Sequence, residues 1–213
     1  GQTVSADFLS IETNITDPLS GQSQSIAHFD ANGKLLETID SSDGFRNNTY
    51  YSYDEQGRIS KIMTESISAG GFEIKELHIW TYNENNKPAS MLKIKNGKDT
   101  SFVRFVADDQ GDPGEERAVH QGQPLPVYYY YFDQQHRLTD IVRYNERAKR
   151  LLPDYIFEYE DGRLATMLVV PEGNSDYQKW YYSYDADGLK LQDACYSKTQ
   201  TLIGRVEYKY IFK

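Results

Sequence analysis

The stretch YSYDEQGRISKI at residues 51–62 recurs in altered form as YYFDQQHRLTDI at residues 130–141. Each copy has an aromatic residue, an aspartate, two variable residues, a glycine or histidine, a basic residue and then aliphatic residues. Self-similarity at a regular spacing is the sequence signature of repeat proteins. Aligning the chain on the aromatic residue before the turn, here called the anchor, gives gaps of 23 to 29 residues that average about 26. The eight anchors are Phe29, Tyr53, Tyr82, Phe105, Phe132, Tyr159, Tyr184 and Tyr210.

Each repeat predicts a β-hairpin. Tyrosine and β-branched residues before the turn favour a strand. Asp-x-x-Gly is turn chemistry, because aspartate can accept hydrogen bonds from its own backbone and glycine adopts a positive φ without steric cost. Asn86 and His136 stand where the glycine belongs, and both residue types tolerate a positive φ well. The spacing of Ile59 and Ile62 would also fit a helix, but the run is short and bounded by turn signals, so we favour a β-bulge or strands that are apolar on both faces.

The repeat YSYDEQGRISKI is similar to the YD-repeat family, known from Rhs-type bacterial proteins and teneurins, whose core is Tyr-Asp-x-x-Gly-Arg-Leu. The resemblance covers most of residues 25–213, with 51–62 the closest match. It implies consecutive hairpins that form a long, curling β-sheet. The spacing drifts, several units replace the aspartate or the glycine, and the chain shows neither an Rhs core signature nor a C-terminal toxin domain. We therefore expect a small, stand-alone, divergent relative rather than a toxin shell.

The sequence predicts an all-β fold of about seven consecutive antiparallel hairpins and a terminal strand, in one extended sheet. About fifteen strands at ~4.8 Å spacing would give a sheet roughly 70 Å wide. Open twisted sheets rarely exceed about ten strands without curling, so we expect strong curvature; whether the sheet closes is left open. We assign residues 1–24 to a polar N-terminal segment and 25–213 to the repeat domain. The polar stretch 106–124 is predicted to be a long loop that could mark a seam.

Composition narrows the classes of function. The net charge of −9 and pI near 5.0 argue against nucleic-acid binding, which needs clustered lysine and arginine. Eighteen tyrosines suit half-exposed sheet faces around limited cores. No apolar run reaches the roughly 18–20 residues of a transmembrane helix. The chain starts with GQTVSADFLSIETN and without methionine, and we expect an exported protein (periplasmic, outer-surface or secreted) whose signal has been removed.

Motifs for chemistry are sparse, and the sequence predicts no catalytic residue and no cofactor. The four histidines lack metal-ligand spacing, and Cys195 is the single cysteine, which we expect to be a buried, inert thiol. No Gly-x-Ser-x-Gly elbow or phosphate-binding loop occurs. The acidic stretch at 108–116 is expected to be solvated. Its oxygen-rich side chains make Asp108, Asp109 and Asp112 weak Ca²⁺ candidates.

The aromatic residues remain as ligand candidates. We expect most of them to pack within the repeats, while an exposed aromatic face would serve protein docking or glycan stacking. We hypothesise a non-enzymatic, exported interaction or scaffold module at the cell envelope, with an unknown protein or glycan as partner. The alternative is a carbohydrate-binding module, and a glycan-active hydrolase is less favoured. The candidate binding residues are Trp80, Tyr128, Tyr129, Tyr130, Trp180 and Tyr182.

Overall fold

The computed structural model describes residues 9–17, 21–42, 44–171 and 176–212, and within them it contains only strands, turns and bends. The described residues form seventeen strands. They are β1 (Leu9–Asp17), β2 (Gly21–Phe29), β3 (Leu35–Ser42), β4 (Phe45–Tyr53), β5 (Ile59–Ser68), β6 (Glu73–Tyr82), β7 (Pro88–Lys95), β8 (Asp99–Ala107), β9 (Pro113–His120), β10 (Gln123–Pro124), β11 (Tyr128–Phe132), β12 (Leu138–Asn145), β13 (Arg150–Glu160), β14 (Arg163–Val169), β15 (Gln178–Tyr184), β16 (Lys190–Ser197) and β17 (Leu202–Phe212).

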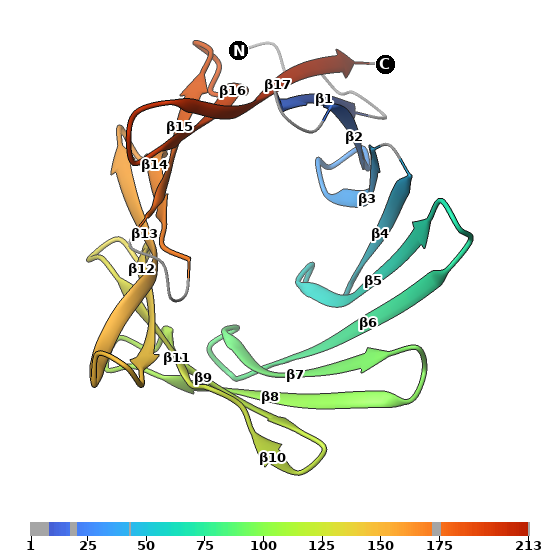
Figure 1. Ribbon diagram of the computed structural model, residues 1–213. Coiled ribbons are helices and arrows are strands. Elements are labelled where there is room, and N and C mark those ends of the chain that lie inside the picture. The colour runs from blue at the N-terminus through green and yellow to red at the C-terminus, as the bar shows by residue number, and fades with distance from the viewer. Residues whose placement is uncertain (1–8, 18–20, 43, 172–175, 213) are drawn as a thin grey trace.

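The strands form one antiparallel sheet in which each strand pairs with the next along the chain, except near β10. β10 is a two-residue partner of β9, and β9 also pairs with β11 through two residue pairs only. β17 pairs with β1, and β1 pairs with β2, so the sequence of pairings returns to its first strand. The strands run round in a ring (Figure 1). This confirms the all-β fold of consecutive hairpins in one strongly curved sheet.

No helix in the described part of the chain has the length and apolar character needed to cross a membrane.

The predicted turns share one hydrogen-bond pattern. The Asp54 Oδ1 accepts the backbone N–H groups of Gln56 and Arg58 at 3.0 and 2.8 Å, and the Gly57 N–H donates to the Asp54 carbonyl at 2.9 Å. Asn86 and His136 replace the glycine with φ values of 60° and 59°, as their residue types predicted. The same pattern occurs in the turns that begin at Asp30, Asn83, Asp108, Asp133 and Asp185.

A β-bulge follows the turn and explains the spacing of Ile59 and Ile62. The register of β4 and β5 shifts between Ser52 and Tyr53, so that Tyr53 lies opposite Ile59 while Ser52 lies opposite Lys61. The extra residue in β5 changes the face that the following side chains occupy. The bulge interpretation is confirmed, and the same irregularity recurs beside the turn in the pairs β2–β3, β6–β7, β8–β9, β11–β12, β13–β14 and β15–β16.

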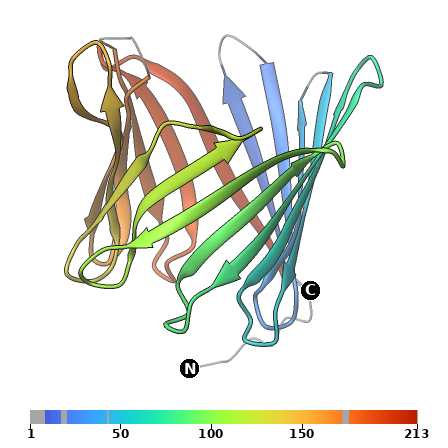
Figure 2. The ribbon, with the colours of Figure 1, turned by 90° about the horizontal axis from the view of Figure 1, so that it is seen from below.

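All these turns lie along one edge of the sheet, the lower edge in Figure 2. The first described residue, Leu9, lies opposite both Phe29 and Phe212. The two ends of the described sheet therefore meet at the same edge, beside the turn that follows Phe29. Contacts between neighbouring turns can consequently run along this edge from one hairpin to the next.

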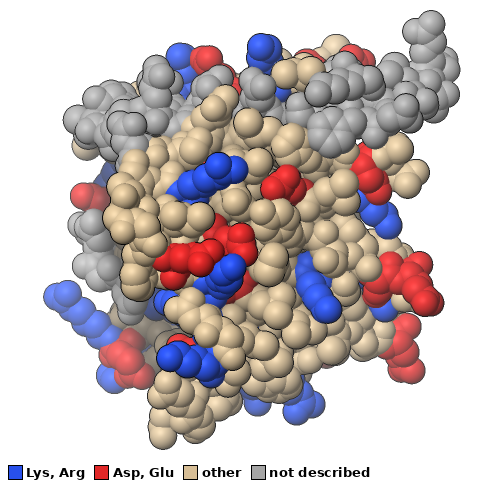
Figure 3. All heavy atoms as spheres, turned by 90° about the vertical axis from the view of Figure 1, so that its right-hand side faces the viewer, with Lys and Arg blue, Asp and Glu red and all other residues tan. Residues whose placement is uncertain are grey.

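The sheet has two faces, named here by the anchors. The anchor face carries the anchors and the residues two and four positions before them, because side chains alternate along a strand. The opposite face carries the intervening residues and includes the exposed side chains of Met63, Phe102 and Val119. Figure 3 shows the side of the molecule that lies on the right in Figure 1. On this side, positively and negatively charged side chains are interspersed among uncharged residues. Ion pairs such as Lys75–Glu65, at 2.9 Å, join neighbouring strands.

Few apolar side chains in the described part of the chain are buried, in line with the limited core expected from composition. They are Val103, Val142, Ala194, Cys195 and Val206. Cys195 is 2% exposed, and burial raises the pKa of its thiol. A buried, largely protonated thiol is a poor nucleophile, so the expected burial of Cys195 is confirmed.

The prediction of a long loop over residues 106–124 is wrong. Asp108 begins a regular turn, and Pro113–His120 form β9, which pairs with β8 from Ala107 to Ser101. The acidic residues are compatible with a strand because they have partners there: Glu115 pairs with Arg117 at 2.6 Å, and Glu116 accepts a hydrogen bond from the hydroxyl of Tyr130. The polar residues of this stretch therefore belong largely to a strand with charged side chains and not to a long loop.

Replacing Gly33 by alanine should lower the free energy of unfolding by about 1 kcal/mol, because a residue with a Cβ is disfavoured at positive φ. Gly33 has φ +78° and a Cβ there would meet no atom within 4 Å, so steric contact adds nothing to this cost. Urea unfolding measures the change. Gly33→Asn should cost less, since Asn86 holds the equivalent turn position; equal losses in the two variants would contradict this explanation.

Candidate functional site

Four tyrosine anchors each connect their hairpin to the one before it. The Tyr82 hydroxyl donates to the Ile59 carbonyl at 2.6 Å, and the Arg58 guanidinium lies 4.4 Å from the centre of the Tyr82 ring. The residues involved are the basic and aliphatic positions of the preceding repeat. The same arrangement joins Tyr53 to Lys34 and Leu35, Tyr159 to Arg137 and Leu138, and Tyr184 to Arg163 and Leu164.

These anchor hydroxyls act as structural donors. Burial raises the pKa of Tyr53, Tyr82, Tyr159 and Tyr184. The hydroxyls therefore stay protonated and donate to backbone carbonyls in the neutral pH range. The repeated tyrosine, arginine and aspartate positions are accordingly used to hold successive turns together.

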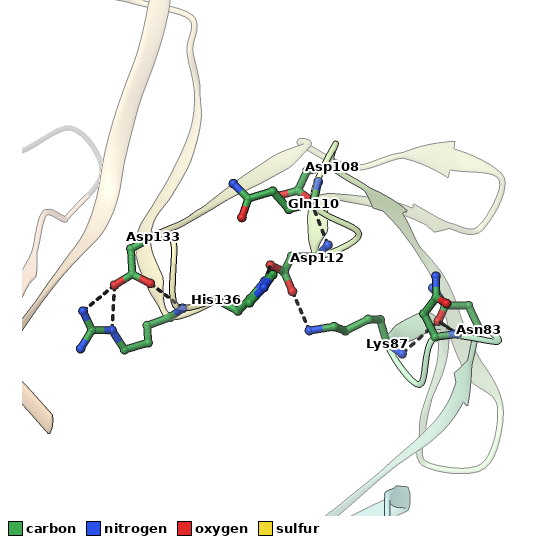
Figure 4. A network of polar contacts seen from close by, with 9 residues as sticks. Asn83, Lys87, Asp108, Gln110, Asp112, Asp133 and His136 are labelled. Carbon is green, nitrogen blue, oxygen red and sulfur yellow. Dashed lines mark hydrogen bonds and ion pairs between the residues drawn. The ribbon is translucent and has the colours of Figure 1, made fainter. Parts of the chain in front are cut away.

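Ala107 and Phe132, the residues before the turns at Asp108 and Asp133, have no hydroxyl, and an ion-pair cluster occupies this part of the edge. The Lys87 Nζ lies 2.6 Å from Asp112 Oδ1, and the His136 Nδ1 lies 2.5 Å from Asp112 Oδ2. These three residues, here called the Asp112 clamp, come from three successive turns. Asp112 lies between its two partners (Figure 4). It is 1% exposed, whereas the side chains of Lys87 and His136 are 38% and 52% exposed.

The Asp112 carboxylate is stabilised in its charged form. Burial by itself raises the pKa of Asp112, but the hydrogen bonds and positive charge of Lys87 and His136 outweigh it and hold the pKa below its ordinary value. Asp112 occupies the position at which other repeats carry Lys34, Arg58 or Arg137. A negative charge has thus replaced a positive one, and the neighbouring turns supply the compensating partners.

The Ca²⁺ candidates lie in one turn, and the carboxylates of Asp108 and Asp112 are occupied by protein partners. Asp108 Oδ1 accepts the N–H groups of Gln110 and Asp112 at 2.9 Å each. Both Asp112 oxygens contact the clamp residues, and Asp109 is exposed. Within the described residues, no group of three His, Cys, Asp or Glu side chains is arranged to hold a metal ion. A Ca²⁺ ion at this turn would have to displace lysine and histidine from Asp112.

The six aromatic candidates are half-buried and do not form one cluster. Trp80 stacks on Phe105 with ring centres 5.7 Å apart. Trp180 belongs to β15, which lies across the ring from β6, the strand of Trp80 (Figure 1). Tyr129 lies on the opposite face. The other five lie on the anchor face, as the pairings with β7, β12 and β16 show: Trp80, Tyr128, Tyr130, Trp180 and Tyr182.

Several tyrosine hydroxyls on the anchor face bind carboxylates. The Tyr130 hydroxyl donates to Glu116, and the Tyr208 hydroxyl donates to Asp193 Oδ2 at 2.5 Å. Burial and the neighbouring carboxylate raise the pKa of both tyrosines. Burial raises the pKa of Tyr182 to about 12, with a further contribution from the charge of Asp193. These hydroxyls are therefore held neutral and are committed to internal contacts.

A different arrangement occurs on the opposite face of β15 and β16. A hollow of about 450 Å³, here called the Tyr181 hollow, is bounded by tyrosine, glutamine and small residues. Tyr181 and Tyr196 meet edge to face with ring centres 5.6 Å apart, and the Lys179 Nζ lies 5.4 Å from the Tyr181 ring centre. Tyr181 is 39% exposed, and Ala194 is buried opposite it in the register. The lining residues are Tyr181, Tyr182, Ser183, Gln192, Ala194, Tyr196 and Gln200.

Four polar side chains of the hollow have no hydrogen-bond partner within the described chain, whereas the Ser183 hydroxyl donates to the Gln192 carbonyl at 3.3 Å. The Tyr181 and Tyr196 hydroxyls and the amides of Gln192 and Gln200 make no hydrogen bond to another described side chain or backbone group. Amides and hydroxyls each offer both donors and acceptors. The Tyr181 hollow thus combines an aromatic wall with uncommitted hydrogen-bonding groups.

Sequence reasoning named Tyr182 but missed Tyr181, Tyr196 and the Asp112 clamp. Tyr181 is the neighbour of a named residue, yet the two side chains lie on opposite faces of β15. A signal for Asp112 was present, since it stands at a position where most repeats carry a basic residue. The identity of its partners depends on which turns become neighbours.

Comparison with known proteins extends the fold assignment. No model of a known protein family and no curated protein sequence matches the chain. Among solved structures, the chain is similar to a porin-like protein from Bacteroides uniformis, with 8% identity, 99% of each chain covered and a TM-score of 0.56. A second match is to the Photorhabdus luminescens Tc holotoxin pore, with 12% identity, a TM-score of 0.26, and 81% of this chain against 13% of that one. The first match shows a shared overall fold.

Proposed function

We propose that the protein is a non-enzymatic, exported interaction and scaffold module at the cell envelope. The observation that carries this proposal is that some polar groups bind within the protein while others have no internal partner. Turn aspartates, anchor tyrosines and the Asp112 clamp hold the hairpins together. By contrast, two hydroxyls and two amides of the Tyr181 hollow have no hydrogen-bond partner among the described residues and are available to a ligand or partner. The likeness in fold to a porin-like protein is compatible with export.

The composition of the hollow supports binding over hydrolysis. Glycoside hydrolysis generally requires two carboxyl groups flanking the substrate. The described residues that line the Tyr181 hollow include neither aspartate nor glutamate. A carbohydrate-binding role is the second candidate, favoured by the aromatic and amide side chains of the same hollow.

Envelope binding tests the proposal. Labelled protein should co-sediment saturably with cell envelopes isolated from the source organism, and unlabelled protein should compete, because a specific site is filled. Protein-free liposomes of the same lipids provide the control. Linear, non-competable sedimentation would count against an interaction module.

The same preparations test the absence of enzymatic activity. Incubating the protein with envelope polysaccharides should release no new reducing ends above a heat-denatured control. Time-dependent release that follows protein concentration would replace the proposal with the hydrolase alternative.

A further inference from the structure

The Tyr181 hollow has a defined architecture. In the register of β15 and β16, Tyr181 lies opposite Ala194 and Ser183 lies opposite Gln192. Side chains at these positions share one face, and the small Ala194 between the larger neighbours leaves the space. Gln200, in the turn before β17, is exposed and has φ +62°. Rigid strands therefore supply the aromatic wall, and the turn supplies one amide.

This combination of groups suits a sugar ring. A pyranose has a face of C–H groups that packs on an aromatic ring and a rim of hydroxyls that both donate and accept hydrogen bonds. Aromatic side chains provide large contact area at low conformational cost. Uncommitted glutamine amides satisfy neighbouring hydroxyls through their paired donor and acceptor. We propose that the Tyr181 hollow binds a pyranose unit of a neutral oligosaccharide.

The charges around the hollow favour a neutral ligand. None of the described residues that line it is charged. The nearby Lys179 lies over the Tyr181 ring and is 3.4 Å from Glu158 Oε2, so its charge already has a partner. An anionic ligand would instead call for arginine or lysine aimed into the site. The partly exposed Tyr181, Ser183 and Gln200 leave the hollow accessible to one unit of a longer chain.

Titration calorimetry with defined oligosaccharides tests the site. The probes are maltohexaose, cellohexaose, chitohexaose and mannohexaose, followed by an array of neutral glycans. At least one should bind saturably with one site per chain. Tyr181→Ala should weaken this binding by about tenfold or more, and Gln200→Gly, which retains the positive φ, by about threefold.

Matched variants distinguish ligand binding in the Tyr181 hollow from nonspecific binding to other aromatic side chains. Tyr131 is an exposed tyrosine of β11, at 49% exposure, and lies on the same face as Tyr129, away from the anchor face. Tyr131→Ala should leave binding unchanged within about twofold. A Trp80→Ala/Trp180→Ala variant tests the earlier aromatic candidates. Circular dichroism and thermal unfolding establish that each variant is folded.

Each outcome is decisive for this site. Binding that is lost in Tyr181→Ala and weakened in Gln200→Gly supports the inference. Absence of binding to all probes and glycans overturns it, as does binding that survives Tyr181→Ala or depends on Tyr131 or the two tryptophans. The inference rests on the proposed function, but the two fail separately: saturable envelope binding without oligosaccharide binding removes the site and leaves the interaction module.

Discussion

Tyr53→Ala should lower the free energy of unfolding by about 3 kcal/mol, as truncation of a large aromatic side chain commonly does. The ring packs on the anchor face, the hydroxyl donates to the Leu35 carbonyl at 2.7 Å, and the Lys34 Nζ lies 5.1 Å from the ring centre. The substitution removes both contacts to the preceding hairpin together with the packing of the ring. Urea unfolding followed by circular dichroism measures the loss.

Tyr53→Phe isolates the contribution of the hydroxyl. It should cost about 1 kcal/mol, the usual net value of one hydrogen bond. Phe29 and Phe132 occupy the same position in other repeats, so the ring itself is accommodated. A Tyr53→Ala variant that unfolds at the same urea concentration as the parent would show that the anchors are surface residues.

Asp112→Asn should lower the free energy of unfolding by about 2 kcal/mol. Removing one partner of a buried ion pair costs roughly 3–5 kcal/mol, but Lys87 and His136 are partly exposed and can regain water. The amide keeps the shape of the side chain while it removes the charge that both partners contact. Chemical unfolding at neutral pH measures the effect.

Two variants in the same turns serve as controls. Asp109→Asn removes an exposed charge next to the clamp and should change stability by less than about 0.5 kcal/mol. His136→Asn keeps a residue that tolerates positive φ, as Asn86 does, but removes one clamp contact. Its cost should fall between those of the other two variants; a loss in Asp109→Asn equal to that in Asp112→Asn would contradict a specific clamp.

The Asp112 clamp also predicts that the stability of the folded protein depends on pH. The folded-state pKa of Asp112 lies below the ordinary value of 3.8. Its carboxylate therefore contributes stability at pH values above the unfolded-state pKa, and this contribution is lost as the pH falls through the folded-state pKa. The stability difference between the protein and Asp112→Asn should shrink below about pH 4. A difference that stays constant down to the onset of acid unfolding would exclude an ionic origin.

Local chemistry made the hairpins predictable. Asp54 and Gly57 fix a turn through contacts within five residues, and the tolerance of Asn86 and His136 for positive φ follows from their own side chains. The error over residues 106–124 arose because polarity was taken as a loop signal. In β9, pairing partners such as Tyr130 for Glu116 make charged strand positions favourable, and they come from a later strand.

The candidate site was less predictable for a related reason. Trp80 and Trp180 are prominent in the sequence, yet they lie in strands on different sides of the ring. Tyr181 and Tyr196 were not among the candidate binding residues, because their proximity depends on the register between β15 and β16. The sequence indicated that aromatic side chains would be available, without showing which of them share a face.

The sequence by itself determined the repeated hairpin, its turn and the strong curvature of a sheet with so many strands, because these follow from interactions within one repeat and from strand number. It favoured a bulge only as one of two explanations for the spacing of Ile59 and Ile62. Only the tertiary structure decided that β17 pairs with β1, that Asp112 joins three successive turns, and that the Tyr181 hollow forms. Each of these depends on which strands and turns become neighbours. The register and curvature of the sheet decide which strands and turns lie next to one another. Both are properties of the whole sheet rather than of any one repeat.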